Sequence, residues 1–244
     1  ISSRPSRMPT TPAKAERSLN SVQRTAGRLD TLFFLPVVLC TPRTLLFATL
    51  LFVGSPLFAE ENPLVDLEKF IPDMRVEVRY ATSDNFMKEK LYPEARCLLR
   101  AEVAEKLKRV QESLKKQGLS LKIFDGYRPL SVQKKMWAKF PLEGYVANPA
   151  KGSNHNRGAA VDVTLADNDG KELAMPSLYD EFSERAHRDY AGGTEEERAH
   201  RKILEDAMKR EAFVGISSEW WHFDDAEAKK YPVLDLSFAS VERE

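Results

Sequence analysis

Cysteine is scarce in this sequence, and the chain has no net charge. The 244 residues include 2 cysteines, Cys40 and Cys97, and neither belongs to a Cys-x-x-Cys pair or a Cys/His cluster. A zinc site with cysteine ligands is therefore not expected. The 37 basic and 37 acidic residues cancel to a formal net charge of zero. Without a strong basic field, the chain is not expected to bind nucleic acid.

The remaining composition is typical of a soluble protein. Hydrophobic residues make up 42% of the chain and charged residues 30%, and its 244 residues suffice for one good-sized domain or two small ones. Residues 1–30 are rich in Ser, Arg, Thr and Pro and show no apolar periodicity. We expect them to form a disordered or non-native N-terminal extension. The first residue is Ile1, which is consistent with vector sequence or with sequence upstream of the true start.

Residues 31–59 have the features of a secretory signal peptide. Two apolar runs, residues 31–40 and 44–53, lie on either side of Arg43, and Ala59 is a small residue at a suitable cleavage point. Each run is shorter than the roughly 20 residues that span a bilayer. We therefore expect cleavage near Ala59, export to the periplasm, and a folded domain at residues 60–244 with no stable membrane span. An uncleaved membrane anchor and a buried core segment are the alternatives that these runs leave open.

Hydrophobic periodicity predicts a mixed domain without internal repeats. Apolar residues recur at helical spacing in residues 99–117, and weaker patterns predict helices at residues 131–140 and 194–210. Alternating or β-branched stretches predict strands at residues 74–80, 119–124 and 159–165, at the end of residues 213–223, and as a short edge strand at residues 231–236. This order predicts an α+β fold, a single domain with a mainly antiparallel central sheet flanked by helices.

Two histidines and one aspartate form the ligand set of a catalytic zinc site. His155 precedes the strand predicted at residues 159–165, Asp162 lies within it, and His222 follows about sixty residues later. Catalytic zinc takes three protein ligands and leaves a fourth position for water. Asp162 lies between two valines, where a carboxylate is costly to bury without a cation. Taken singly, the alternatives are a surface-loop histidine, a strand-end cap and an aromatic core patch around His222.

Glu219 is three residues before His222 and is free to act on the water that such a zinc ion binds. A regular strand would place these two side chains on opposite faces of the sheet, so we expect an irregular stretch near Trp220 and Trp221. His187 and His200, the other two histidines, lie in charged segments, where a surface role is favoured.

Arg128 follows the strand predicted at residues 119–124. An arginine at this position can stabilise the oxyanion of a tetrahedral intermediate. The alternative is a structural ion pair, for example with Asp125.

The motifs resemble those of the zinc D-alanyl-D-alanine dipeptidases and related DD-peptidases: Ser153-x-His155-x-x-Gly158-x-Ala160-x-Asp162, followed by Glu219-x-x-His222. The resemblance extends to residues 80–86, 125–129 and 179–184 and covers roughly residues 64–238. It implies that one Zn²⁺ per subunit is bound by His155, Asp162 and His222. It also implies Glu219 as general base and acid, Arg128 as oxyanion stabiliser, Ser153 at the substrate carboxylate and Asp180 at the substrate ammonium.

The implied reaction is hydrolysis of the D-alanyl-D-alanine dipeptide, the small-molecule partner, by the catalytic domain at residues 60–244. Zinc lowers the pKa of its bound water to about 7, and Glu219 takes the proton and later delivers it to the leaving amine. One alternative is a D,D-carboxypeptidase or endopeptidase that acts on longer peptidoglycan stems. Another is a non-catalytic wall-binding module with a structural metal. The sequence does not fix the oligomeric state or the physiological role.

Overall fold

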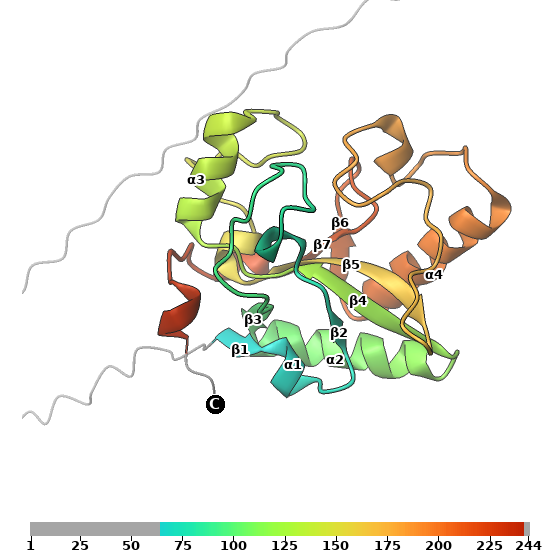
Figure 1. Cartoon of the computed structure of the whole chain (residues 1–244). Helices are drawn as coiled ribbons and strands as arrows, with labels where there is room; N and C mark the ends of the chain where they lie inside the picture. Colours follow the sequence, from blue (N-terminus) through green and yellow to red (C-terminus); the bar gives the residue numbers. More distant parts are fainter. Residues whose placement is uncertain (1–63, 242–244) are drawn as a thin grey trace, which may run out of the picture. The chain divides into compact units, whose positions relative to one another are not determined.

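The protein, described by a computed structural model, combines helices and a mainly antiparallel sheet over residues 64–241 (Figure 1). These residues belong to one compact unit, Pro56–Glu244. The extension expected at residues 1–30 and the signal peptide expected at residues 31–59 lie outside the described residues. Within residues 64–241, none of the helices combines the length and the apolar character needed to cross a membrane.

Four α-helices and seven strands make up the described part of the chain. The helices are α1 (Leu67–Phe70), α2 (Ala101–Lys115), α3 (Leu130–Lys139) and α4 (Glu195–Arg210). The strands are β1 (Leu64–Asp66), β2 (Arg75–Val76), β3 (Leu98–Arg100), β4 (Leu119–Asp125), β5 (Ala160–Asp167), β6 (Phe213–Gly215) and β7 (His222–Asp225).

The central sheet has five strands in the order β2-β4-β5-β7-β6. Its neighbours pair antiparallel except for β2 and β4, which are parallel. A separate antiparallel pair joins β1 to β3. The prediction of an α+β fold with a mainly antiparallel sheet is confirmed.

Helices α2 and α4 pack against the sheet and against each other. Helix α2 contacts β4, and α4 contacts β5 and β6. Figure 1 shows α2 along the lower side of the sheet and α3 above it. Because residues 160–166 of β5 are all buried, this strand lies at the centre of the core.

The strongest sequence pattern, the helix expected at residues 99–117, is realised as α2. Its apolar residues Val103, Leu107, Val110 and Leu114 are completely buried, as their spacing predicts. The helix ends before Gly118, whose positive φ of 71° allows the chain to reverse into β4. The helix predicted at residues 194–210 is also present, and its capping box between Thr194 and Glu197 is formed.

Two predicted strands are wrong in extent or kind. Residues 74–80 alternate in burial as expected, but only Arg75 and Val76 pair as a strand, and the chain then enters a 3₁₀ helix at Arg79–Ala81. The edge strand predicted at residues 231–236 does not form. Leu234 instead makes one backbone hydrogen bond to Leu130, at the start of α3, and one to Asn156, in a 3₁₀ helix, and Pro232 removes one backbone donor.

The stretch at residues 213–223 contains an additional strand. The prediction placed a loop first and a strand second, whereas β6 (Phe213–Gly215) comes first, then a loop, then β7. The antiparallel pairing of β6 with β7 makes residues 216–221 a connection between neighbouring strands. That connection carries Glu219.

Candidate active site

Strand register brings Asp162 and His222 side by side. In the antiparallel pair of β5 and β7, Asp162 is directly opposite His222. The β4–β5 pairing contains a bulge between Ile123 and Asp125, which places Asp125 opposite Asp162 as well. Since directly opposed residues share a face of the sheet, the side chains of Asp125, Asp162 and His222 lie next to one another on three neighbouring inner strands.

His155 reaches the same point from a short 3₁₀ helix, His155–Arg157. The helix ends at Gly158 with φ of 66°, and this left-handed residue turns the chain into β5. A Cβ atom at Gly158 would lie 2.5 Å from Leu64 Cδ2, so a larger residue would have to displace that side chain as well as adopt the left-handed conformation. The left-handed turn at Gly158 is how the chain bends to bring His155 and Asp162 together.

The potential ligand atoms of these three residues form a nearly equilateral triangle. His155 Nε2 lies 3.1 Å from His222 Nδ1 and 3.3 Å from Asp162 Oδ1, and His222 Nδ1 lies 3.1 Å from Asp162 Oδ1. Ligands about 2.0–2.1 Å from a tetrahedral zinc ion are separated by roughly 3.3 Å, the edge of that tetrahedron. The triangle therefore matches one coordination face of zinc.

The outer nitrogens of both histidines have acceptors that fix the tautomers. His155 Nδ1 donates to the carbonyl oxygen of Gly126 at 2.7 Å, and His222 Nε2 donates to Asp224 Oδ1 at 3.0 Å. In its neutral form, each ring then turns an unprotonated nitrogen toward the carboxylate of Asp162. Two nitrogen lone pairs and a carboxylate at this distance repel one another unless a cation joins them.

The electrostatics of the site favour positive charge. Burial lowers the pKa of His222, but its hydrogen bonds to Asp162 and Asp224 outweigh that effect and raise the pKa to about 10. Burial raises the pKa of Asp162, and the two histidines more than offset it, so the pKa of Asp162 falls below its usual value. Among residues 64–241, His155, Asp162 and His222 are the group arranged to hold a metal ion.

Glu219 lies in the connection between β6 and β7, outside the regular ladder. The backbone N–H of the next residue, Trp220, donates to the carbonyl oxygen of Ala186 at 2.9 Å, so the 3₁₀ helix Glu184–Ala186 holds this segment. The irregular stretch predicted before His222 is confirmed. Glu219 is 7% exposed, and burial raises its pKa to about 8. A carboxyl group with a pKa near neutrality can accept and release a proton.

Arg128 has a fixed position beside the triangle. Its guanidinium donates to Asp125 Oδ2 at 2.7 and 3.1 Å and to Gln133 Oε1 at 2.9 Å. One nitrogen, Nη2, lies 4.0 Å from Asp162 Oδ2. The ion pair with Asp125 considered from the sequence is present. It does not exclude the oxyanion role, because Arg128 also lines the cavity beside the triangle.

Ser153 and Asp180 line the same cavity. The Ser153 hydroxyl accepts a hydrogen bond from the backbone N–H of His155 at 3.2 Å. Asp180 accepts from the Tyr80 hydroxyl at 3.2 Å and from the Phe86 backbone N–H at 3.3 Å. Burial, followed by the charge of Asp162, raises the pKa of Asp180 to about 7.

The cavity has a volume of about 290 Å³ and an aromatic wall. We define the aromatic wall as Phe86, Tyr145 and Phe182, one residue from each of three loops. The ring of Phe182 lies 4.8 Å from that of Tyr145 and 5.1 Å from that of Phe86, measured between centroids. The wall joins segments that are far apart in sequence, so sequence spacing gave no indication of it.

The two other histidines do not take part in the site. His187 and His200, expected at the surface, are half-buried: His187 contacts the Tyr145 hydroxyl at 3.4 Å, and His200 bonds to the Ala174 carbonyl oxygen at 2.9 Å. Asp224 was not singled out from the sequence. Its position two residues after His222 in a strand, on the same face, was a usable signal.

Comparison with known proteins identifies the family. The family model described as Peptidase_M15, D-ala-D-ala dipeptidase, matches residues 60–241. The chain belongs to the D-Ala-D-Ala dipeptidase family. It is therefore a peptidase, and the family predicted from the motifs is confirmed. The match covers all of residues 64–241, so every residue of the triangle lies inside the family's own region.

Curated members of the D-Ala-D-Ala dipeptidase family are similar over most of their length. A D-alanyl-D-alanine dipeptidase of Escherichia coli is 38% identical over 181 residues, which is 74% of this chain and 94% of that protein. The D-alanyl-D-alanine dipeptidase of Enterococcus faecium is 32% identical, with 64% of this chain and 88% of that protein covered. That of Enterococcus faecalis is 30% identical, with 73% and 98% covered.

Proposed function

We propose that this peptidase hydrolyses D-alanyl-D-alanine to two D-alanines with one Zn²⁺ held by His155, Asp162 and His222. The supporting observation is the convergence of the three ligand atoms, 3.1–3.3 Å apart, in a small cavity that also contains Glu219. The substrate is the one named for the curated relatives in the two Enterococcus species and in E. coli.

The ligand set has the chemistry that zinc requires. Two neutral imidazole nitrogens and one carboxylate leave a fourth tetrahedral position open. When bound, zinc would supply Lewis acidity, which lowers the pKa of water and polarises a carbonyl group. Asp224 and the Gly126 carbonyl oxygen orient the two histidines from behind, since such outer partners fix ring orientation in metal sites.

Glu219 is proposed as the group that moves protons. Its carboxylate accepts a proton from the attacking water and then delivers one to the amine that leaves as the peptide bond breaks. Burial raises the pKa of Glu219 to about 8, so its carboxyl group can both accept and release a proton near neutral pH. A structural metal site needs no spare carboxylate beside it, so Glu219 favours catalysis over a wall-binding module.

Arg128 is proposed to stabilise the oxyanion that develops on the peptide carbonyl. Asp125 and Gln133 hold the guanidinium at the edge of the cavity, so little reorganisation is needed during reaction. Ser153 is proposed to bind the substrate carboxylate and Asp180 the substrate ammonium. An anionic Asp180 within the cavity would select a free amino terminus, which a dipeptide has and the interior of a longer stem does not.

The aromatic wall favours a dipeptide over longer peptidoglycan stems. A volume of about 290 Å³ is at the small end of the roughly 300–1,000 Å³ typical of pockets for drug-sized ligands. Phe182 contacts both other members of the wall, and Asp180 stands two residues before it. This arrangement restricts the length of peptide that can extend past Asp180. Action on a longer stem remains the second candidate if the wall opens.

We further propose that the enzyme is exported to the periplasm after cleavage near Ala59. The support is the pair of apolar runs at residues 31–53 with Arg43 between them. An uncleaved membrane anchor is the alternative, and fractionation of cells with sequencing of the mature N-terminus distinguishes the two.

A substrate panel tests the proposed activity. Purified protein is assayed on D-Ala-D-Ala, L-Ala-L-Ala and a pentapeptide stem ending in D-Ala-D-Ala, with and without a chelator, while bound zinc is measured. We expect chelator-sensitive release of D-alanine from the dipeptide alone and one zinc per chain. Release from the stem at an equal rate would favour the carboxypeptidase. Absence of chelator-sensitive release from any peptide would refute the proposal.

A further inference from the structure

The two carboxylate oxygens of Asp162 have different partners. Oδ1 faces His155 Nε2 at 3.3 Å and His222 Nδ1 at 3.1 Å. Oδ2 accepts a hydrogen bond from the Tyr179 hydroxyl at 3.0 Å and has Arg128 Nη2 at 4.0 Å. Tyr179 therefore holds the oxygen that points away from the triangle.

The Tyr179 ring is held on two sides. Its centroid lies 4.6 Å from that of Phe124 and 5.4 Å from that of Trp221, the latter edge-on. Phe124 belongs to the β4 bulge and Trp221 immediately precedes His222, so the ring packs against the strands that carry the site. A carboxylate can only accept hydrogen bonds, so the Tyr179 hydroxyl, 3.0 Å from Asp162 Oδ2, is the donor.

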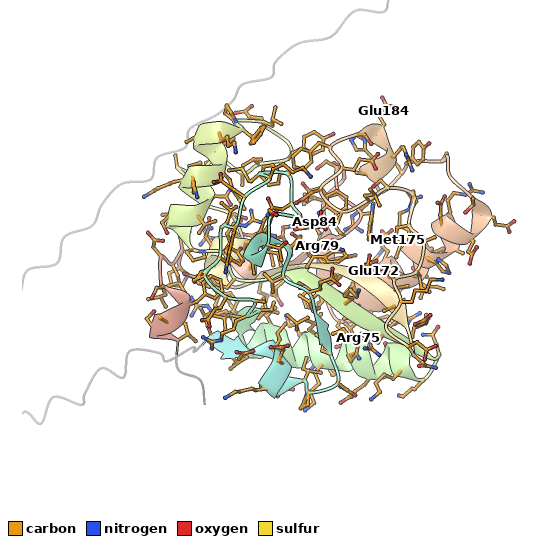
Figure 2. All side chains as sticks on the ribbon, viewed as in Figure 1. Arg75, Arg79, Asp84, Glu172, Met175 and Glu184 are labelled. Atoms are coloured by element: carbon orange, nitrogen blue, oxygen red, sulfur yellow. The ribbon has the colours of Figure 1, made fainter. Side chains whose placement is uncertain are left out.

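Tyr179 does not reach the substrate cavity. Of the two neighbouring residues, Asp180 lines the cavity of about 290 Å³ and Tyr179 does not. Both line a second cavity, of about 620 Å³, together with Arg79, Asp84 and Glu172. Figure 2 labels these three charged residues, and Arg79 pairs with both carboxylates. Tyr179 thus contacts Asp162 and lines the second cavity, but it does not line the cavity proposed for the substrate.

The next residue links this contact to substrate binding. Asp180 has φ of 58°, a left-handed conformation that is rare for a residue with a side chain. The turn lets Tyr179 point to Asp162 while Asp180 points into the cavity, where it bonds to the Tyr80 hydroxyl and the Phe86 backbone N–H. Two consecutive residues therefore have two different proposed roles. Tyr179 contacts the proposed metal ligand Asp162, and Asp180 supplies the carboxylate proposed to bind the substrate ammonium.

We propose that Tyr179 is a positioning residue that holds Asp162 as a one-oxygen ligand, with Oδ1 toward the metal and Oδ2 on the Tyr179 hydroxyl. This inference rests on the metal site of the proposed function. Without the hydroxyl, the Asp162 carboxylate is free to rotate or to present both oxygens to the ion. Outer hydrogen-bond partners of metal ligands typically contribute about 10–100-fold to metal affinity.

Tyr179→Phe tests the proposal because it removes one oxygen and keeps the ring against Phe124 and Trp221. The full-length protein is stripped of metal and its melting curve is compared with that of the wild type. Zinc affinity is then measured by competition with a chelator, and the cobalt-substituted protein is examined by visible absorption. We expect metal-free protein that still folds but melts at a slightly lower temperature, because one buried hydrogen bond is lost, together with zinc binding weaker by about 10–100-fold and an altered cobalt spectrum.

Tyr80→Phe is the matched control. It also removes a buried tyrosine hydroxyl, but one that donates to Asp180 at 3.2 Å rather than to Asp162. We expect this variant to raise KM for the dipeptide and to keep zinc affinity within about twofold of the wild type, whereas Tyr179→Phe loses affinity for the metal itself.

The outcomes distinguish failure of the proposed metal site from failure of the proposed role of Tyr179. If wild-type protein binds no zinc, the proposed metal site fails and this inference fails with it. If the wild type binds zinc and Tyr179→Phe binds it equally well with the same cobalt spectrum, only the role of Tyr179 is refuted. Equal weakening by Tyr80→Phe would also refute that role, because the effect would then come from loss of any buried hydroxyl.

Discussion

The metal-ligand triangle and the aromatic wall are built in different ways, although they border one cavity. Asp162 and His222 are opposed by the register of β5 and β7, so neither can shift without breaking the ladder that pairs them. Phe86 and Phe182 come from loops and meet through ring contacts, each worth about 0.5–1.5 kcal/mol. The comparison indicates that the groups proposed for the chemistry are fixed by backbone pairing, while the boundary proposed to select substrate depends on weaker side-chain contacts.

The largest expected effect comes from Glu219, which lines the cavity that both regions border. Glu219→Gln removes the proton acceptor but leaves His222 in its strand, so kcat should fall by about 10²–10⁴ with zinc still bound. Turnover with D-Ala-D-Ala and bound zinc are measured on the same preparation. His222→Ala serves as the contrast, since it should lose both zinc and turnover. A Glu219→Gln enzyme with a near-normal rate would end the assignment of Glu219.

A change in the wall should alter substrate length without disturbing the metal. Phe182→Ala removes the ring that contacts both Tyr145 and Phe86, so the rate on a stem peptide relative to the dipeptide should rise about tenfold. Zinc affinity should stay at the wild-type value.

Phe140→Ala is the control for the wall. Phe140 contacts Phe86 at 5.6 Å but does not line the cavity, so its loss should leave the length preference unchanged. Equal preferences in wild type and Phe182→Ala would show that the wall does not set substrate length.

The smallest expected effect concerns Asp180 and pH. Burial raises the pKa of Asp180 from 3.8 to about 7, so the folded state binds this proton more tightly than the unfolded state. The free energy of unfolding contributed by Asp180 therefore falls as pH rises from about 4 to about 7. In metal-free protein, Asp180→Asn should raise the melting temperature more at pH 8 than at pH 5. An equal change at both pH values would contradict the burial argument.

The sequence predicted much of this molecule because several signals were local. The spacing of Val103, Leu107 and Leu114 predicted α2, and Thr194 with Glu197 predicted the start of α4. Where a segment depended on distant partners, local pattern failed. Residues 74–80 alternate correctly, yet pairing stops after Val76. Residues 231–236 bond through Leu234 to helical residues, Leu130 and Asn156, rather than to a strand.

The candidate active site shows the same difference between features that local sequence predicts and features that depend on distant segments. His155, Asp162, His222 and Glu219 were selected from the sequence because few residue types can bind zinc or move protons, and the need for an irregular stretch before His222 followed from strand alternation. Tyr179 was not given a role, since a tyrosine is common in cores and its contact with Asp162 joins positions 17 residues apart. The bulge that sets Asp125 opposite Asp162 likewise left no local trace.

The sequence by itself determined the chemistry available to this protein: two imidazoles, carboxylates and an arginine in a pattern that identifies the family. Only the tertiary structure decided which atoms meet. Register set the 3.1 Å separation of His222 Nδ1 from Asp162 Oδ1, and Gly158 turned His155 toward them. Residue type fixes what a side chain can bind, whereas distance between side chains depends on pairing between segments that the sequence keeps far apart.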